Sequence, residues 1–238
     1  NALKDYEVLA KMVPDAPLIH RIIGDLNFQA NEFEAAIEAY SEAILWDDQN
    51  EIAIFNRGVA QIQIEAYHPA ISDFEAVLAL DQNHVEAQKR LADAYFLIDW
   101  FQQAINSYQA AIVLDDNDPL LFYNLGKANQ QLQRYEQARG AYEEALQLKA
   151  DFEEAAIARS EMTLQMGDFQ QAVADITAAI NLVPENDMLH LNRGVANFNL
   201  GDFEAAIPDF TQAIALNQDL LDAYHQRGMA FFQQGEYE

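Results

Sequence analysis

Three asparagines at a fixed spacing have the clearest potential to bind another molecule. Asn56, Asn124 and Asn192 stand 68 residues apart. A carboxamide donates and accepts hydrogen bonds at once, so it can hold an extended backbone without demanding a particular sequence. Apolar and aromatic residues near these asparagines would supply pockets for side chains: Phe55, Val59, Tyr123, Leu191 and Val195. The alternative is that the asparagines recur through duplication and only bond neighbouring helices.

No arrangement of residues typical of catalysis or of metal binding accompanies these asparagines. None of the five histidines stands at metal-ligand spacing from another. The run Asp115–Asp118 superficially suggests a calcium loop, but it lacks the central glycine and the terminal glutamate. No glycine loop that would cradle a phosphate and no nucleophile motif is present. The sequence therefore predicts no enzyme, no cofactor and no metal site within this chain.

The elements that must position the asparagines recur every 34 residues. Alanine occupies seven positions at this unbroken spacing, and the length of 238 residues is seven times 34; the alanines are Ala2, Ala36, Ala70, Ala104, Ala138, Ala172 and Ala206. A fixed period of this length is typical of a unit that stacks on copies of itself, because one unit cannot bury its apolar face alone.

Other columns of the repeat predict two helices. If Pro17 is position 1, the recurring alanine is position 20, position 17 is always aromatic, position 24 is large and position 27 is mostly alanine. Steps of three and four place these residues on one helix face. Position 8 is always small and mostly glycine, which predicts a close contact between helices there. We expect an A helix at positions 2–14 and a B helix at positions 18–30, with Pro69 and Pro208 in the first turn of a B helix.

These columns together resemble the tetratricopeptide repeat signature. The resemblance covers the whole chain and is clear in Leu125-Gly126-Lys127-Ala128 and in Gly201-Asp202-Phe203-Glu204-Ala205-Ala206-Ile207. It implies an all-α fold, a right-handed superhelical solenoid of antiparallel helix pairs. It is weak for function, because the matching residues are packing residues.

The phase of the period divides the chain, residues 1–238, into one array of repeats. We expect a B helix of a truncated repeat at 1–16, six whole repeats at 17–50, 51–84, 85–118, 119–152, 153–186 and 187–220, and an A helix of a truncated repeat at 221–238. Because the last helix carries Tyr224, Met229, Phe231 and Phe232 rather than a polar cap, we expect the sequence to be a fragment of a longer array.

The resemblance implies that the A helices line a concave groove with positions 2, 5, 6, 9, 12 and 13. Helical geometry agrees, because these positions lie away from the packing stripe at positions 4, 8 and 11. The candidate peptide-binding residues are Arg21, Phe55, Asn56, Val59, Lys89, Arg90, Tyr123, Asn124, Lys127, Leu191, Asn192 and Val195. The four basic residues of this set all precede the acids Glu154, Glu161 and Asp222 along the chain, so a bipolar groove would orient a charged peptide.

Related co-chaperones grip a C-terminal carboxylate with basic residues and asparagines in successive repeats. Arg21, Asn56 and Arg90 match that clamp in kind. Asp25 and Glu86 stand where the clamp has an asparagine and a lysine, and they would repel a carboxylate. We therefore disfavour the clamp. We expect Arg57, Arg193 and Arg227, at position 7, to pair with acids on adjacent helices.

Composition limits the classes of partner. The net charge is −26 with 13 basic residues, so nucleic acid is not expected as a partner, whereas a basic protein or a high-salt habitat would suit the acidity. No apolar run is long enough to insert into a membrane. The absence of cysteine excludes disulfides and leaves the compartment open.

Three functions follow from these observations. The first is a non-catalytic scaffold that binds an extended peptide or a partner helix in the groove. The second is a self-assembly module whose copies associate head to tail. The third is a targeting array attached to an enzyme outside this sequence, such as a protein glycosyltransferase.

Overall fold

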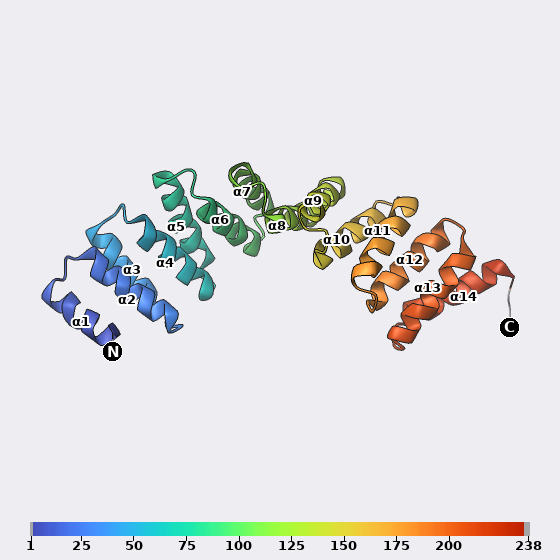
Figure 1. Cartoon of the computed structure of the whole chain (residues 1–238), viewed down its shortest axis with the longest axis horizontal. Helices are drawn as coiled ribbons and strands as arrows, with labels where there is room; N and C mark the ends of the chain where they lie inside the picture. The colour runs from blue at the N-terminus through green and yellow to red at the C-terminus, as the bar shows by residue number, and fades with distance from the viewer. Residues whose placement is uncertain (1, 236–238) are drawn as a thin grey trace. The chain divides into compact units, whose positions relative to one another are not determined.

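Fourteen α-helices and no strand make up the part of the chain that the computed structural model describes, residues 2–235. They form two compact units, Asn1–Asp116 (the N-terminal unit) and Asn117–Glu238 (the C-terminal unit) (Figure 1). The N-terminal unit contains α1 (Ala2–Met12), α2 (Pro17–Gln29), α3 (Phe33–Trp46), α4 (Glu51–Gln63), α5 (Tyr67–Leu80), α6 (Val85–Leu97) and α7 (Phe101–Leu114). The C-terminal unit contains α8 (Pro119–Gln131), α9 (Tyr135–Leu148), α10 (Glu153–Gln165), α11 (Phe169–Leu182), α12 (Asp187–Asn199), α13 (Phe203–Leu216) and α14 (Leu221–Gln234).

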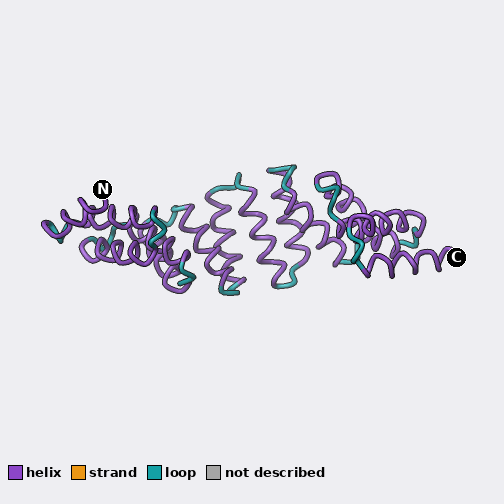
Figure 2. Tube along the Cα trace, turned by 90° about the horizontal axis from the view of Figure 1, so that it is seen from below, coloured by secondary structure: helices purple, strands orange, loops and turns teal. Residues whose placement is uncertain are grey.

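Consecutive helices pack on one another within each unit, joined by short loops (Figure 2). The even-numbered helices are the A helices and the odd-numbered ones are the B helices. A helices also contact the next A helix, α2 with α4 and α4 with α6 in the N-terminal unit, and α10 with α12 and α12 with α14 in the C-terminal unit. A helices begin at position 1 and, from α3 onward, B helices begin at position 17, each one residue earlier than predicted. Residues 236–238, the end of the predicted last segment, lie outside the described residues.

The predicted packing stripe is the core of both units. From α3 onward the alanine at position 20 is fully buried in each B helix, as Ala36 and Ala138 show, and the residue at position 24 is at most 2% exposed. The glycines at position 8 lie directly under these side chains. A Cβ added at Gly24, Gly58, Gly126 or Gly194 would lie within 2.4 to 2.9 Å of the aromatic ring of the same repeat. The predicted close contact is therefore confirmed at these four glycines.

The turn from A helix to B helix has the same backbone in every repeat. The residue at position 15 adopts a left-handed conformation, and it is glycine only at Gly167, Gly201 and Gly235. Asn31, Glu65, Asp99 and Gln133 take φ values of 57° to 62° without being glycine. Four side chains at position 34 accept a hydrogen bond from a backbone N–H of the following A helix and so cap it; they are Asn50, His84, Asp118 and Asn186.

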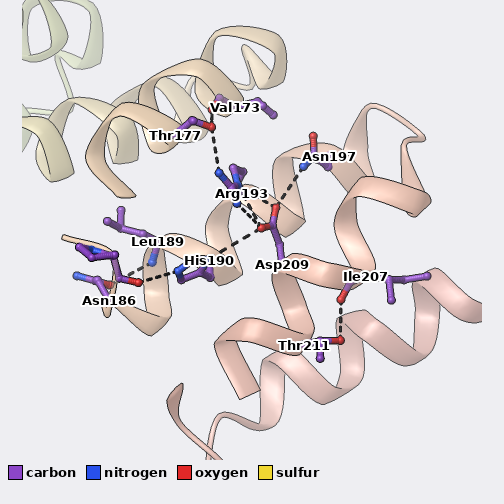
Figure 3. A network of polar contacts seen from close by, with 11 residues as sticks. Val173, Thr177, Asn186, Leu189, His190, Arg193, Asn197, Ile207, Asp209 and Thr211 are labelled. Atoms are coloured by element: carbon purple, nitrogen blue, oxygen red, sulfur yellow. Dashed lines mark hydrogen bonds and ion pairs between the residues drawn. The ribbon is translucent and has the colours of Figure 1, made fainter. Parts of the chain in front are cut away.

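Arginines at position 7 tie three helices together. Arg193 donates to both carboxylate oxygens of Asp209 on α13, with a shortest distance of 2.6 Å, and to the Thr177 hydroxyl on α11 at 3.2 Å (Figure 3). Arg57 repeats the arrangement with Asp73 at 2.7 Å and Ser41 at 3.1 Å. The predicted acid pairing is confirmed for these two arginines. It is wrong for Arg227, which donates to the Thr211 hydroxyl at 3.2 Å and lies over the Tyr224 ring.

One proline does not lie where the sequence predicts. Pro208 is the sixth residue of α13, inside the helix rather than in its first turn. Proline has no backbone N–H, so α13 lacks one helical hydrogen bond at this residue. The helix still continues unbroken to Leu216, because its apolar face is buried on both sides of Pro208, at Ala206 and Phe210.

Candidate functional site

The N-terminal unit has a pocket of about 370 Å³ on the face of its A helices. Its lining comes from α2, α4 and α6, with one tyrosine from α3: Asp25, Phe28, Gln29, Tyr40, Phe55, Asn56, Val59, Glu86 and Arg90. Every lining residue of an A helix stands at position 2, 5, 6, 9, 12 or 13 of its repeat. Phe28, Phe55 and Val59 make one wall apolar, and the remaining wall is polar.

The Asp25 carboxylate collects three hydrogen bonds in this pocket. It accepts from the Arg21 guanidinium at 2.9 Å, from the Tyr40 hydroxyl at 2.9 Å and from the Asn56 amide nitrogen at 3.0 Å. Burial and the neighbouring Asp25 raise the pKa of the Tyr40 phenol, which therefore stays a hydrogen-bond donor. Because Gly24 has no side chain, the Tyr40 ring can cross α2 and reach this carboxylate. The Asn56 amide thus forms a hydrogen bond between α4 and α2. For Asn56, the structure therefore shows a bond between neighbouring helices, as the alternative to peptide binding predicts.

The three predicted basic site residues of the N-terminal unit are paired with acids. Arg90 bonds Glu86 on its own helix at 2.9 Å, and Lys89 lies outside the pocket with its Nζ atom 3.7 Å from Asp115. Arg21 is held by Asp25. Local acids therefore pair with these three charges, and the orientation of a charged peptide by a bipolar groove stays a prediction. The two acids that depart from the clamp pattern bind the three residues that match it: Asp25 accepts from Arg21 and Asn56, and Glu86 pairs with Arg90.

The C-terminal unit has a second pocket, of about 390 Å³, at the same repeat positions. It is lined by α8 and α10, with one tyrosine from α9: Tyr123, Lys127, Gln130, Gln131, Tyr142, Glu154, Ile157, Ala158 and Glu161. The rings of Tyr123 and Tyr142 lie 5.7 Å apart, and the Tyr142 hydroxyl donates to the Gln130 side chain at 2.7 Å. The Lys127 ammonium lies over the Tyr123 ring, 5.5 Å from its centre.

Two carboxylates of this second pocket lack internal partners. Glu154 is exposed and Glu161 is half-buried, and neither makes a hydrogen bond or an ion pair with a residue between 2 and 235. Burial raises the pKa of the Glu161 carboxyl. Burial, followed by the charges of Glu154 and Glu161, raises the pKa of the Tyr123 phenol. Two carboxylates and the Lys127 ammonium therefore lie beside the aromatic rings of this pocket.

The structure brings only half of the sequence-predicted residues to the two pockets. Phe55, Asn56, Val59 and Arg90 line the first, and Tyr123 and Lys127 line the second. Arg21 lies beside the first pocket through its bond to Asp25, and Lys89, Asn124, Leu191, Asn192 and Val195 line neither.

Leu191 and the asparagines differ from one another in their surroundings. Leu191 is 5% exposed, because it packs against the buried cluster around Phe210, so the prediction that it offers an open apolar surface is wrong. Val195 packs against the same cluster in part. The Asn192 side chain makes no hydrogen bond with residues 2–235, unlike Asn56. The 68-residue period of asparagine therefore does not correspond to one repeated contact.

The acids Asp25, Glu86, Glu154 and Glu161 stand at positions 9 and 2, which the sequence assigns to the groove, but these columns vary too much along the chain for their acids to be chosen as binding residues. The tyrosines at position 24 belong to the predicted packing stripe, and the sequence does not predict that they also line a pocket. A glycine at position 8 opposite a tyrosine at position 24 is the signal that could have found Tyr40 and Tyr142, because the glycine lets the ring lie against the A helix and tyrosine adds a hydroxyl group.

Neither a metal site nor a membrane-spanning helix is present in the described part of the chain. Among residues 2–235, no three His, Asp or Glu side chains gather in an arrangement that could hold a metal ion. No helix in this part of the chain combines the length and the apolar character needed to cross a bilayer.

Comparison of the fold with solved structures gives close agreement at low sequence identity. The C-terminal part of a TPR repeat-containing protein from Cytophaga hutchinsonii matches with a TM-score of 0.77 at 17% identity, over 94% of this chain and 93% of that chain. YrrB, described as a TPR protein with an unusual peptide-binding site, matches with a TM-score of 0.70 at 21% identity, over 79% of this chain and 97% of that chain. MamA matches with a TM-score of 0.56 at 23% identity, over 85% and 92% of the two chains.

Comparison of the sequence points to the same group. Human peptidyl-prolyl cis-trans isomerase FKBP4 is 33% identical over 73 residues, which are 31% of this chain and only 16% of that protein. One family model described as tetratricopeptide repeat matches residues 1–50, 163–220 and 198–238, and a second with this description matches 119–152. A model described as TPR repeat matches 101–133. The chain therefore belongs to the tetratricopeptide repeat family.

Proposed function

We propose that this chain is a non-catalytic scaffold that binds an extended peptide or a partner helix on the faces formed by its A helices. The observation that carries the proposal is the recurrence of one kind of pocket: each unit has one, and in each the A-helix lining stands at positions 2, 5, 6, 9, 12 and 13. Tetratricopeptide repeat folds serve as protein-interaction scaffolds, and the related YrrB is described as having a peptide-binding site.

The composition of the N-terminal pocket favours a peptide over a small charged ligand. Its acids and bases are engaged with one another, so the open surface that remains for a ligand is the apolar wall of Phe28, Phe55 and Val59. An apolar side chain of a peptide would bury this wall. Gln29 and Arg90 at the exposed rim carry groups that can bond a peptide backbone.

Peptide selection tests this proposal. Peptides would be selected from a random library on the 238-residue protein, and their Kd values measured by calorimetry. Val59→Arg places a charge in the apolar wall, so we expect it to weaken binding at least about tenfold, equivalent to roughly 1.4 kcal/mol. Val113→Arg is the matched control, because Val113 is 85% exposed on α7 and lies outside the pocket.

The proposal fails if no peptide is selected, or if Val59→Arg and Val113→Arg bind the selected peptides equally well. Thermal unfolding of both variants shows whether a loss of binding reflects a loss of folded protein. A peptide that binds Val113→Arg like the unmodified protein and binds folded Val59→Arg weakly supports the assigned face.

Head-to-tail self-association is a second function that a specific observation favours. Gly228, at position 8 of α14, has nothing within 4 Å of an added Cβ, unlike the glycines that pack against an aromatic ring. Tyr6 of α1 stands at position 24, the place of that ring, and Leu9 at position 27 is 41% exposed. We infer that α1 of one copy can place Tyr6 on Gly228 of another, an open heterologous contact.

Light scattering across protein concentrations tests this second function. The unmodified protein is expected to increase in mass with concentration, and Gly228→Val is expected to stay monomeric because its side chain occupies the place of the ring. Gly140→Val, whose added Cβ would also meet nothing within 4 Å but lies on α9, is the control and should associate normally. A strict monomer at every concentration, or equal association of both variants, overturns the assignment.

A further inference from the structure

Both pockets contain an acid at repeat position 9, but only the acid of the N-terminal pocket accepts hydrogen bonds from neighbouring side chains. Asp25 and Glu161 both stand at position 9. Around Asp25, the donors come from Arg21 at position 5, Tyr40 at position 24 and Asn56 at position 6 of the next repeat. The comparable residues around Glu161 are Ile157, Ile176 and Asn192.

These replacements remove the internal donors from Glu161. Isoleucine at positions 5 and 24 cannot donate a hydrogen bond, and Asn192 makes none with residues 2–235. Glu161 is nevertheless half-buried, and this burial raises the pKa of its carboxyl. A half-buried carboxylate without a partner is costly, so a cation from outside would be stabilised there.

The rest of the pocket suits a long basic side chain. Tyr123 and Tyr142 offer aromatic surface, and the ring of Tyr123 already accepts a cation, the Lys127 ammonium, on one face. Glu154 adds a second carboxylate, and the charges of Glu154 and Glu161 both raise the pKa of the Tyr123 phenol. Ala158 also lines this pocket and has only a methyl group as its side chain.

We propose that the C-terminal pocket binds a lysine or arginine side chain of the peptide ligand, whose positive charge pairs with Glu161 while its stem lies against Tyr123. This inference rests on the proposed peptide-binding function. It agrees with the net charge of −26, which favours basic partners. The N-terminal pocket, whose acids are internally satisfied, takes an apolar side chain instead.

A mutant cycle between protein and peptide tests this assignment. The probe is a peptide selected from a random library, together with a version in which each lysine or arginine is changed to glutamine. Glu161→Gln is expected to weaken binding of the original peptide about tenfold and to leave binding of its glutamine version unchanged. Glu143→Gln is the matched control, since Glu143 is an exposed acid on α9 outside the pocket, and we expect little change.

The stability of Glu161→Gln separates a binding role from a structural one. Because the folded-state pKa of Glu161 is raised, the folded state keeps the proton to a higher pH than the unfolded state does, and ionisation at neutral pH lowers stability. We therefore expect Glu161→Gln to raise Tm at neutral pH and to lose this gain as the pH falls below the raised pKa. A lower Tm would indicate a structural role and would overturn the proposal.

The outcomes distinguish this inference from the function on which it rests. If no peptide is selected, the scaffold function itself fails. If peptides bind but contain no lysine or arginine, or bind Glu161→Gln and Glu143→Gln equally, the basic-residue assignment fails while the scaffold function stands. Weakened binding that disappears with the glutamine peptide, together with an unchanged or higher Tm, supports the assignment.

Discussion

Replacing Asp209 by alanine is expected to lower the free energy of unfolding by about 3 kcal/mol, because it leaves a half-buried arginine without its acid. Asp209 is 5% exposed and receives two donors from Arg193, at distances down to 2.6 Å, and one from Asn197 at 3.3 Å (Figure 3). The Thr177 hydroxyl is the other hydrogen-bond partner of the Arg193 guanidinium. About a quarter of Arg193 remains in contact with solvent, so the expected loss lies at the low end of the range for buried pairs.

Urea unfolding followed by circular dichroism measures this loss. Glu136→Gln is the control, because the Glu136–Arg139 pair is long, at 3.7 Å, and its carboxylate is 70% exposed. It should change stability by less than about 0.5 kcal/mol. The double variant Arg193→Met/Asp209→Leu removes both charges and should regain much of the loss. If Asp209→Ala unfolds at the same urea concentration as Glu136→Gln, the network does not stabilise α11, α12 and α13 as described.

Gly126→Val is expected to cost a similar amount, about 3 kcal/mol, through overpacking of α8 against α9. A Cβ at Gly126 would lie 2.4 Å from the nearest carbon of the Tyr142 ring, which is fully buried and cannot swing aside. Ala92 fits opposite Tyr108 at the equivalent position, so a single methyl group can be accommodated in one repeat. The two further methyl groups of valine exceed what this close contact can hold.

The control for this substitution is Gly140→Val in the neighbouring helix α9. Nothing lies within 4 Å of a Cβ added at Gly140, so valine there should change the free energy of unfolding by less than about 0.5 kcal/mol. Both variants are compared by their urea midpoints. Equal midpoints for the two variants would contradict the close helix contact at position 8.

The fold could be predicted almost entirely from the sequence, because the residues that specify it are periodic. Alanine at position 20 and the large residue at position 24 recur in every repeat and are buried wherever a neighbouring A helix covers them, as at Ala36 and Phe74. The left-handed turn at position 15 could be read only where it is glycine. At Glu65 and Gln133 the same conformation is imposed by the helices on either side, and the residue type does not reveal it.

The pockets could be predicted in position but not in detail. The family resemblance indicated the repeat positions that line both pockets. Within these positions, the regular spacing of the asparagines favoured them over the acids. Asn56 turned out to bond Asp25, whereas Asn192 makes no hydrogen bond with residues 2–235 and Leu191 is buried. Whether an acid accepts hydrogen bonds depends on side chains from other helices. The spacing of residues at one repeat position does not show these partners.

Peptide binding at the two pockets can be tested by mapping a bound peptide through NMR chemical-shift changes on the isotope-labelled protein. We expect the largest changes at pocket residues on α2, α4 and α6 and on α8 and α10, such as Phe55, Val59, Tyr123 and Glu161. Changes confined to the exposed apolar residues of B helices, such as Leu45 and Val113, would contradict it.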